Sequence, residues 1–230
     1  MKLHNPLSIL LLDCIIVLGS TISSIKGYSD TQESSYSIHK ALEMRLLVSE
    51  PKIKDPVALA FDHNCQLYVV EMRDYPTGVP NRSKGGAIKL LTDTTGDGEY
   101  DRITQFASKL SYPTSVAPWK GGVLVAAPPN IIYLKDTNGD GVSDIRKTLV
   151  SGFKLGVTDS NFNSLRWGID NWIHGANGGN GGSIRFSEQN KPSTSLRNLD
   201  FRIKPNTFQL ETTSQTGGGF GLVFNEWGHS

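Results

Sequence analysis

The chain has few cysteines, almost no net charge and no hydrophobic run long enough to span a bilayer. Of its two cysteines, Cys14 lies in an N-terminal segment with the features of a cleaved signal, and its removal would leave Cys65 alone, without the paired thiols of a disulfide, a zinc site or a c-type haem site. The 23 Lys and Arg residues balance 22 Asp and Glu residues without a basic stripe, which excludes the charge pattern of a nucleic-acid-binding protein. The apolar run at residues 7–18 is shorter than the roughly 20 residues that a membrane-spanning helix needs.

The N-terminus has the order of features found in a secretory signal. Lys2 precedes the apolar run at residues 7–18, and small residues follow it. We therefore predict a signal peptide at residues 1–24 and an exported protein, whether periplasmic, outer-membrane-associated or extracellular. An uncleaved anchor is the alternative. The Ser-rich residues 25–43 are predicted to be a linker.

Two acidic segments share one pattern. Residues 93–101 read Asp-Thr-Thr-Gly-Asp-Gly-Glu-Tyr-Asp, and residues 136–144 read Asp-Thr-Asn-Gly-Asp-Gly-Val-Ser-Asp. Each segment is preceded and followed by a strand-like run, so each predicts the loop of a β-hairpin. Repeats of short strands at a period of about 40 to 50 residues are typical of β-propellers.

A second repeated unit consists of two apolar runs joined by a short turn. It occurs at residues 56–70, 113–126 and 164–174, and it begins again at residue 219. Joined to the acidic hairpins, these units predict an all-β fold, a β-propeller of four-stranded blades with the apolar pair innermost. Residues 44–230 would hold about three blades and the first strand of a fourth, whereas propellers close with about 4 to 8 blades. We therefore expect an incomplete propeller from a longer protein.

The acidic segments place oxygen ligands where a hard cation needs them. The predicted calcium ligands of the second segment are Asp136, Asn138, Asp140, the carbonyl of Val142, and Asp144. The ligands of a weaker site in the first segment are Asp93, Asp97 and Asp101. Strands flank both segments and neither has the Glu of an EF-hand at position twelve, so the prediction is a calcium-type hairpin loop. The alternative is that Asp and Gly are simply favourable turn residues.

The loops at the opposite end of the predicted blades form the candidate functional face. Loops that position binding and catalytic groups on a rigid scaffold are where function is usually found. The loops of this face are predicted at residues 71–86, 107–112, 127–130, 151–163 and 176–182. Their densest polar cluster contains Arg73 and Asp74. The alternative is that Arg73 forms an ion pair that only stiffens its loop.

Several motifs together resemble one known family. They are residues 55–61, 70–76, 167–172 and 219–228, together with the two acidic segments. Jointly they resemble the membrane-bound dehydrogenase family of planctomycetes and verrucomicrobia, whose members are similar to quinoprotein sugar dehydrogenases of the soluble glucose and sorbosone dehydrogenase type. The resemblance implies pyrroloquinoline quinone (PQQ) as cofactor and a sugar or small alcohol as substrate. It also implies a c-type haem domain in longer relatives, for which this chain has no Cys-x-x-Cys-His motif.

The resemblance also exposes a departure at the position of the catalytic base. The relatives keep a histidine five residues before a leucine that is Leu165 here, and this chain has Ser160 at that position. A serine cannot accept a proton as an imidazole does, and the neighbouring Asp159 is expected to be a solvated carboxylate. We therefore expect a secreted quinoprotein-like dehydrogenase propeller for sugar or alcohol oxidation that is inactive as this chain. The alternative is a non-catalytic, calcium-stabilised propeller that binds carbohydrate or a protein partner.

Overall fold

The computed structural model describes residues 22–23, 36–37, 39–76, 84–215 and 219–228. The chain divides into two compact units, Met1–Val48 and Ser49–Ser230. In the first unit, β1 (Ile22–Ser23) pairs antiparallel with β2 (Tyr36–Ser37).

The predicted signal peptide lies outside the described residues except for β1, and most of the predicted linker does so too. Among the residues that the structure describes, no helix is long and apolar enough to cross a membrane.

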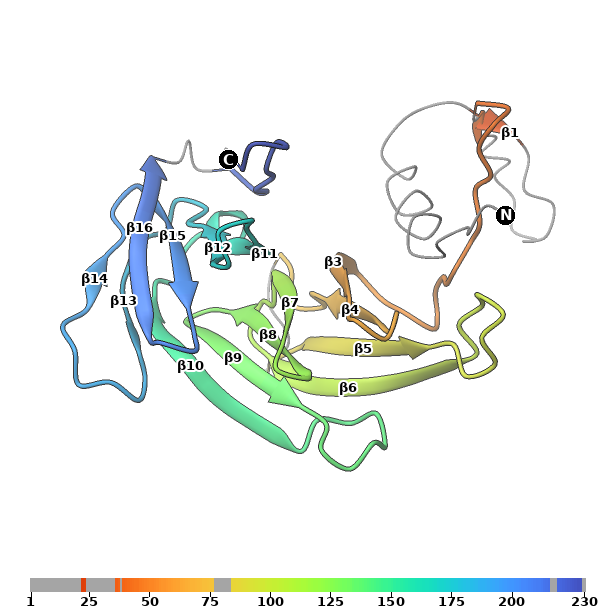
Figure 1. Ribbon diagram of the computed structural model, residues 1–230, viewed down its shortest axis with the longest axis horizontal. Coiled ribbons are helices and arrows are strands. Elements are labelled where there is room, and N and C mark those ends of the chain that lie inside the picture. The colour runs from red at the N-terminus through yellow and green to blue at the C-terminus, as the bar shows by residue number, and fades with distance from the viewer. Residues whose placement is uncertain (1–21, 24–35, 38, 77–83, 216–218, 229–230) are drawn as a thin grey trace, which may run out of the picture. The chain divides into compact units, whose positions relative to one another are not determined.

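The second unit contains three antiparallel sheets (Figure 1). The first sheet consists of β3 (Pro56–Phe61), β4 (Leu67–Glu71), β5 (Gly86–Thr92) and β6 (Arg102–Leu110). The second consists of β7 (Ser115–Trp119), β8 (Gly122–Ala127), β9 (Asn130–Lys135) and β10 (Ile145–Phe153), extended by β13 (Gly182–Phe186) and β14 (Thr194–Ser195). The third consists of β11 (Asn163–Trp167), β12 (Ile173–Ala176), β15 (Leu199–Lys204) and β16 (Gln209–Gln215).

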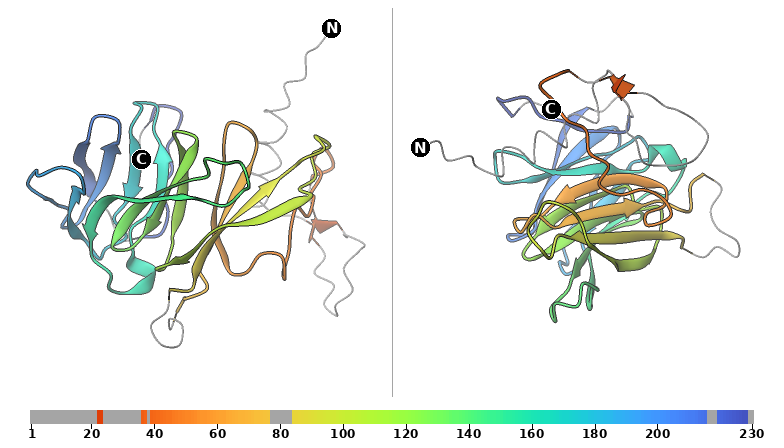
Figure 2. Two further views of the ribbon diagram at one scale, coloured as in Figure 1. Left: turned by 90° about the horizontal axis from the view of Figure 1, so that it is seen from below. Right: turned by 90° about the vertical axis from the view of Figure 1, so that its right-hand side faces the viewer.

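The four main strands of each sheet are hydrogen-bonded in chain order, so each sheet is an up-and-down meander. The left panel of Figure 2 shows the sheets following one another, from the first in orange and yellow to the third in blue. The first strands lie next to one another, because β7 contacts both β3 and β11. The prediction of an all-β fold is therefore confirmed, and so are the two hairpins that carry the acidic loops.

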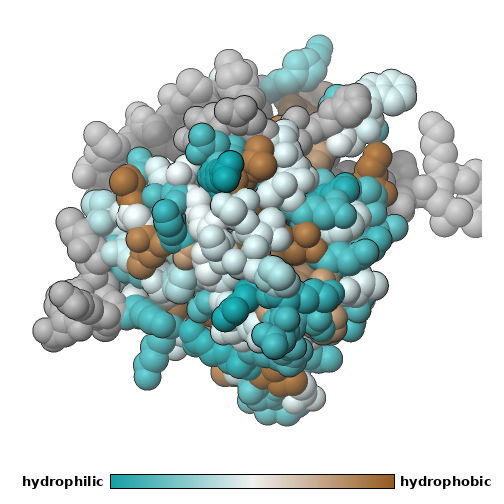
Figure 3. All heavy atoms as spheres, turned by 90° about the vertical axis from the view of Figure 1, so that its left-hand side faces the viewer, coloured by the Kyte–Doolittle hydropathy of each residue, from teal (hydrophilic) through white to brown (hydrophobic). Residues whose placement is uncertain are grey.

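Strand β8 of the middle sheet is buried on both faces. Along β8, alternate side chains point to opposite faces of the sheet. Val123 and Val125 pack in a cluster with the first sheet, whereas Leu124 and Ala126 pack in a cluster with the third. This explains why β8 is a continuous apolar run rather than an alternating one. The outer side over β14–β16 carries hydrophobic residues only at scattered positions (Figure 3).

Two details differ from the predicted strands. Residues 219–228, where the first strand of a fourth blade was predicted, form no strand. Instead, the N–H of Gly221 donates to Asn163 Oδ1 over 3.0 Å and the ring of Phe224 packs edge-on against His174. A strand needs a neighbour to satisfy its backbone groups, and the described residues offer this segment none. The second detail is β13–β14, a hairpin without a predicted counterpart, which pairs with the edge of β10.

Candidate functional site

The second acidic loop (residues 136–144) joins β9 to β10. Its own carboxylates accept hydrogen bonds from its backbone N–H groups. The Asp136 carboxylate accepts backbone N–H bonds of 2.7–3.0 Å from Asn138, Gly139 and Gly141. Asp140 Oδ1 accepts the N–H of Val142 over 2.7 Å. These bonds fix the direction of two predicted calcium ligands.

The first acidic loop (residues 93–101) repeats this arrangement between β5 and β6. The Asp93 carboxylate accepts N–H bonds from Thr95, Gly96 and Gly98. The bond from Gly98 is the main cause that lowers the pKa of Asp93 below its usual value. In the second loop, the hydroxyl and N–H of Thr137 likewise lower the pKa of Asp144. In each loop one carboxylate, Asp93 or Asp144, is therefore favoured in its ionised form.

The described parts of the chain contain no group of three or more His, Cys, Asp or Glu side chains that could hold a metal ion as they stand. The carboxylates are turned toward the loop amides instead. A carboxylate offers about four acceptor positions, so Asp136 keeps capacity beyond its three N–H bonds. The donor set of the second loop consists of oxygens alone, which suits calcium chemically.

The second acidic loop also joins the first two sheets. The Arg102 guanidinium on β6 donates to the carbonyl of Asp140, and the N–H of Ser143 donates to the carbonyl of Phe106 over 2.8 Å. Gly141 has φ +86°, and a Cβ there would lie 3.1 Å from Arg102 Nη2. Glycine is therefore required both by the backbone and by the close approach of the loop to β6.

At the other end of the first sheet, the predicted Arg73–Asp74 cluster exists. Glu71 is fully buried at the end of β4 and accepts the Lys54 N–H over 2.8 Å as well as the Arg73 guanidinium. Asp74 is also buried, and its Oδ2 accepts the Tyr112 N–H over 2.9 Å. Asp74 Oδ1 and Arg73 Nε are buried and have no partner among the described residues. Arg73 therefore forms the predicted ion pair, with Glu71, but Arg73 Nε and Asp74 Oδ1 are left without a hydrogen-bond partner within the residues that the structure describes.

The loop before β11 adds a third buried polar side chain. Asn161 is fully buried, its Oδ1 accepts the Asn180 amide over 3.0 Å, and its Nδ2 has no partner in the described part of the chain. Ser160 and Asp159 lie beside it in a single 3₁₀ turn, η3 (Thr158–Ser160), with Asp159 exposed. None of the five loops of this face contains a histidine in its sequence.

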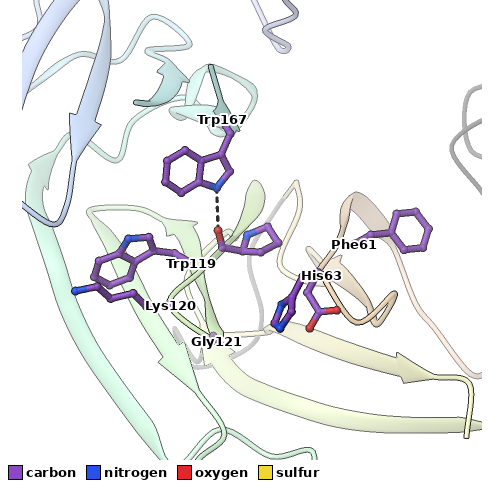
Figure 4. A pocket seen from close by; sticks show the side chains of 9 residues that line it. Phe61, His63, Trp119, Lys120, Gly121 and Trp167 are labelled. Carbon is purple, nitrogen blue, oxygen red and sulfur yellow. Dashed lines mark hydrogen bonds between the residues drawn. The ribbon is translucent and has the colours of Figure 1, made fainter. Parts of the chain in front are cut away.

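A hollow opens between the inner turns of the three sheets (Figure 4). The sequence did not predict it. Its volume is about 330 Å³, and its most prominent side chains are Trp119 and Trp167. These residues end β7 and β11, the first strands of the second and third sheets. A tryptophan repeated at the end of consecutive inner strands is the sequence signal that could have indicated this hollow.

The geometry defines an all-β domain with acidic hairpin loops at one end of its sheets and buried, partly unpaired polar side chains at the other. The family described as Domain of unknown function (DUF7133) matches residues 30–230, and the chain belongs to this family. No curated protein matches the chain. The family description assigns no activity, so the dehydrogenase resemblance stays a prediction.

Proposed function

We propose that the three sheets are blades of a β-propeller in an exported protein, and that the loops at the end opposite the acidic loops bind a sugar or small alcohol. The order of the sheets supports the propeller. Each is an up-and-down meander, and their first strands β3, β7 and β11 adjoin, as the innermost strands of consecutive blades do.

The observation that carries the ligand site is the set of buried polar atoms without partners. Of the four such atoms among the described residues, Arg73 Nε, Asp74 Oδ1 and Asn161 Nδ2 lie in loops of the candidate functional face, and Trp119 Nε1 lies at the end of β7. A buried polar group left unpaired costs about 1 to 3 kcal/mol, so native structures pair such groups with protein, water or ligand. Two donors and one acceptor match hydroxyl groups, which both donate and accept hydrogen bonds.

The same atoms fit PQQ in part, because its carboxylates need donors such as Arg73 Nε and Asn161 Nδ2. A bound PQQ would supply the oxidant that takes up hydride from the alcohol carbon. This chain has Ser160 where relatives keep the base, and we propose that it does not turn over substrate by itself. In a completed site Asp74 is a better candidate for the base than Asp159, because Asp74 is buried with Oδ1 unpaired whereas Asp159 is exposed.

We propose calcium as the second cofactor, bound in the acidic loops and structural in role. The ligands would be those predicted from the sequence, with Asp136, Asp140 and Asp144 supplying the charge. The second loop joins the first two sheets through Arg102 and Ser143, so a cation there would stabilise the contact between blades.

The candidate functional face, formed by the loops opposite the acidic loops, is called the loop face below. A titration of the full chain with PQQ in the presence of calcium, followed by absorbance, tests whether the ligand binds there. Asn161→Ala, and Arg73→Lys, which keeps the charge but removes Nε, should each weaken binding by about tenfold or more, since about 1.4 kcal/mol corresponds to a factor of ten. Asp159→Asn is the matched control and should bind as the parent does. Equal affinity of all four proteins would refute this location of the site.

A second candidate, a non-catalytic propeller that binds carbohydrate or a protein partner, is favoured by the serine at position 160. The same titration separates the two. A chain that binds neutral sugars at the loop face but shows no spectral change with PQQ has the binding function alone.

A further inference from the structure

A groove lined by aromatic side chains runs along the acidic-loop end of the sheets. Its first part is the hollow of about 330 Å³ in Figure 4. The lining consists of Phe61, Asp62 and His63 after β3, residues 118–122 in the turn between β7 and β8, and Trp167. These turns lie at the end of the sheets opposite the loop face, because β3, β7 and β11 all run away from that face.

The second part of the groove is a neighbouring hollow of about 240 Å³ that shares Asp62, His63 and Gly121 with the first. It extends between the first and second sheets to Asp136 of the second acidic loop and to Arg102. The two hollows together are called the indole groove below. Its lining extends from Trp167 in the first hollow to Asp136 of the second acidic loop in the second.

The aromatic walls are held in place by contacts with neighbouring residues. Trp167 is 42% exposed, yet its Nε1 donates to the carbonyl of Pro118 over 2.9 Å, so the ring is fixed while its surface stays open. Trp119 packs edge-on against Tyr133 at 4.9 Å, and the Lys120 ammonium lies 4.9 Å from its ring centre. A large ring that is rigid and solvent-accessible loses little conformational entropy when a ligand covers it.

The polar groups of the groove are balanced in charge, and most of them line the second hollow. Asp62 uses Oδ1 to accept the N–H groups of Asn64 and Gln66 at 2.9 Å, which leaves Oδ2 for a ligand. Burial, followed by the charges of Asp62 and Asp136, raises the pKa of Tyr68 to about 12, so its hydroxyl stays protonated on the wall of the groove.

The carboxylates of Asp62 and Asp136 are offset by the cations of Lys120 and Arg102. Over these four side chains the groove is neutral, which suits a neutral ligand, although Asp136 is also a proposed ligand of calcium. Apolar rings with a few placed polar groups are the usual lining of a small-molecule site.

We propose that the indole groove binds a neutral saccharide, with the C–H face of a sugar ring on Trp167 and its hydroxyl groups hydrogen-bonded to Asp62 and His63. This site lies at the opposite end of the sheets from the loop face and does not depend on the function proposed there. It would hold a chain of sugar units in place without acting on it.

The test is a titration of the full chain with cellotetraose, xylotetraose and maltotetraose, followed by calorimetry and tryptophan fluorescence. At least one should bind with a shift in fluorescence, and Trp167→Ala should weaken that binding by about tenfold or more. Trp167→Phe keeps a smaller aromatic ring without the N–H and should bind more tightly than Trp167→Ala, which separates lost stacking from misfolding. Trp227→Ala is the matched control, because Trp227 is 71% exposed and outside the groove.

Asn161→Ala, which alters the loop face, should weaken only PQQ binding and leave intact the part of the sugar binding that Trp167→Ala removes, so failure of one site is distinguishable from failure of the other. The proposal is overturned if none of the three sugars binds at millimolar concentration. It is also overturned if Trp167→Ala binds them unchanged, or if a pool of uncharged peptides binds in their place.

Discussion

The carboxylate of Asp170 is the centre of a hydrogen-bond network. It accepts the N–H of Trp172, a hydrogen bond from the ring of His174 and one from the Arg202 guanidinium. Arg202 in turn binds Glu211 and lies 4.6 Å from the ring centre of Trp172. Burial raises the pKa of Asp170, but these hydrogen bonds outweigh it and the net pKa is lowered. The sequence alone did not indicate this network, because its members come from β12, β15, β16 and the turn before β12.

Asp170→Asn should therefore destabilise the protein in a pH-dependent way. A lowered folded-state pKa means that Asp170 stabilises the fold above its unfolded pKa of about 3.9 and loses this effect as the pH falls through the folded value. At neutral pH the variant should lose a few tenths to about 1 kcal/mol, since the group is partly exposed and screened. Urea unfolding at neutral and acidic pH measures the difference. The gap should close in acid, and Asp159→Asn should show no gap at either pH; a gap that persists in acid would contradict the assignment.

The elements that the sequence predicted best are those with strong local signals. The hairpins β5–β6 and β9–β10 formed around the acidic loops, and the apolar pairs β3–β4, β7–β8 and β11–β12 formed as their periodicity indicated. The pairing of β13 with β10 could not be predicted, because it depends on which edge is free in the folded chain. The unpaired atoms of Asp74 and Asn161 could not be predicted either, since their surroundings come from distant segments.

Calcium should stabilise the fold through the second acidic loop. A cation present at one hundred times its dissociation constant would add about 2.7 kcal/mol. The melting temperature should rise with calcium and fall with a chelator, and Asp140→Ala should remove most of this response. Asp97→Ala changes the corresponding residue of the first loop, whose carboxylate also accepts an N–H two residues on, and should remove less. If calcium does not move the melting curve of the parent, the loop is only a turn.

At the scale of the whole molecule, we predict that the protein is exported. The pattern of Lys2, an apolar run and small residues predicts that the mature chain begins near residues 20–28, outside the cytoplasm. Mass spectrometry of the expressed protein measures the mature N-terminus directly. A cytosolic species that retains Met1 would show that the segment is not a signal.

The central claim is that the loop face binds a polar ligand but lacks the base that oxidation needs. A general base contributes about 10² to 10⁴ in rate, and Ser160 supplies none. The most direct test is the rate of aldose oxidation by the folded chain, with PQQ, calcium and a dye acceptor present. We predict a rate indistinguishable from the blank without protein. Oxidation well above that blank would contradict the account, and Asp74→Asn would then show whether Asp74 is the base.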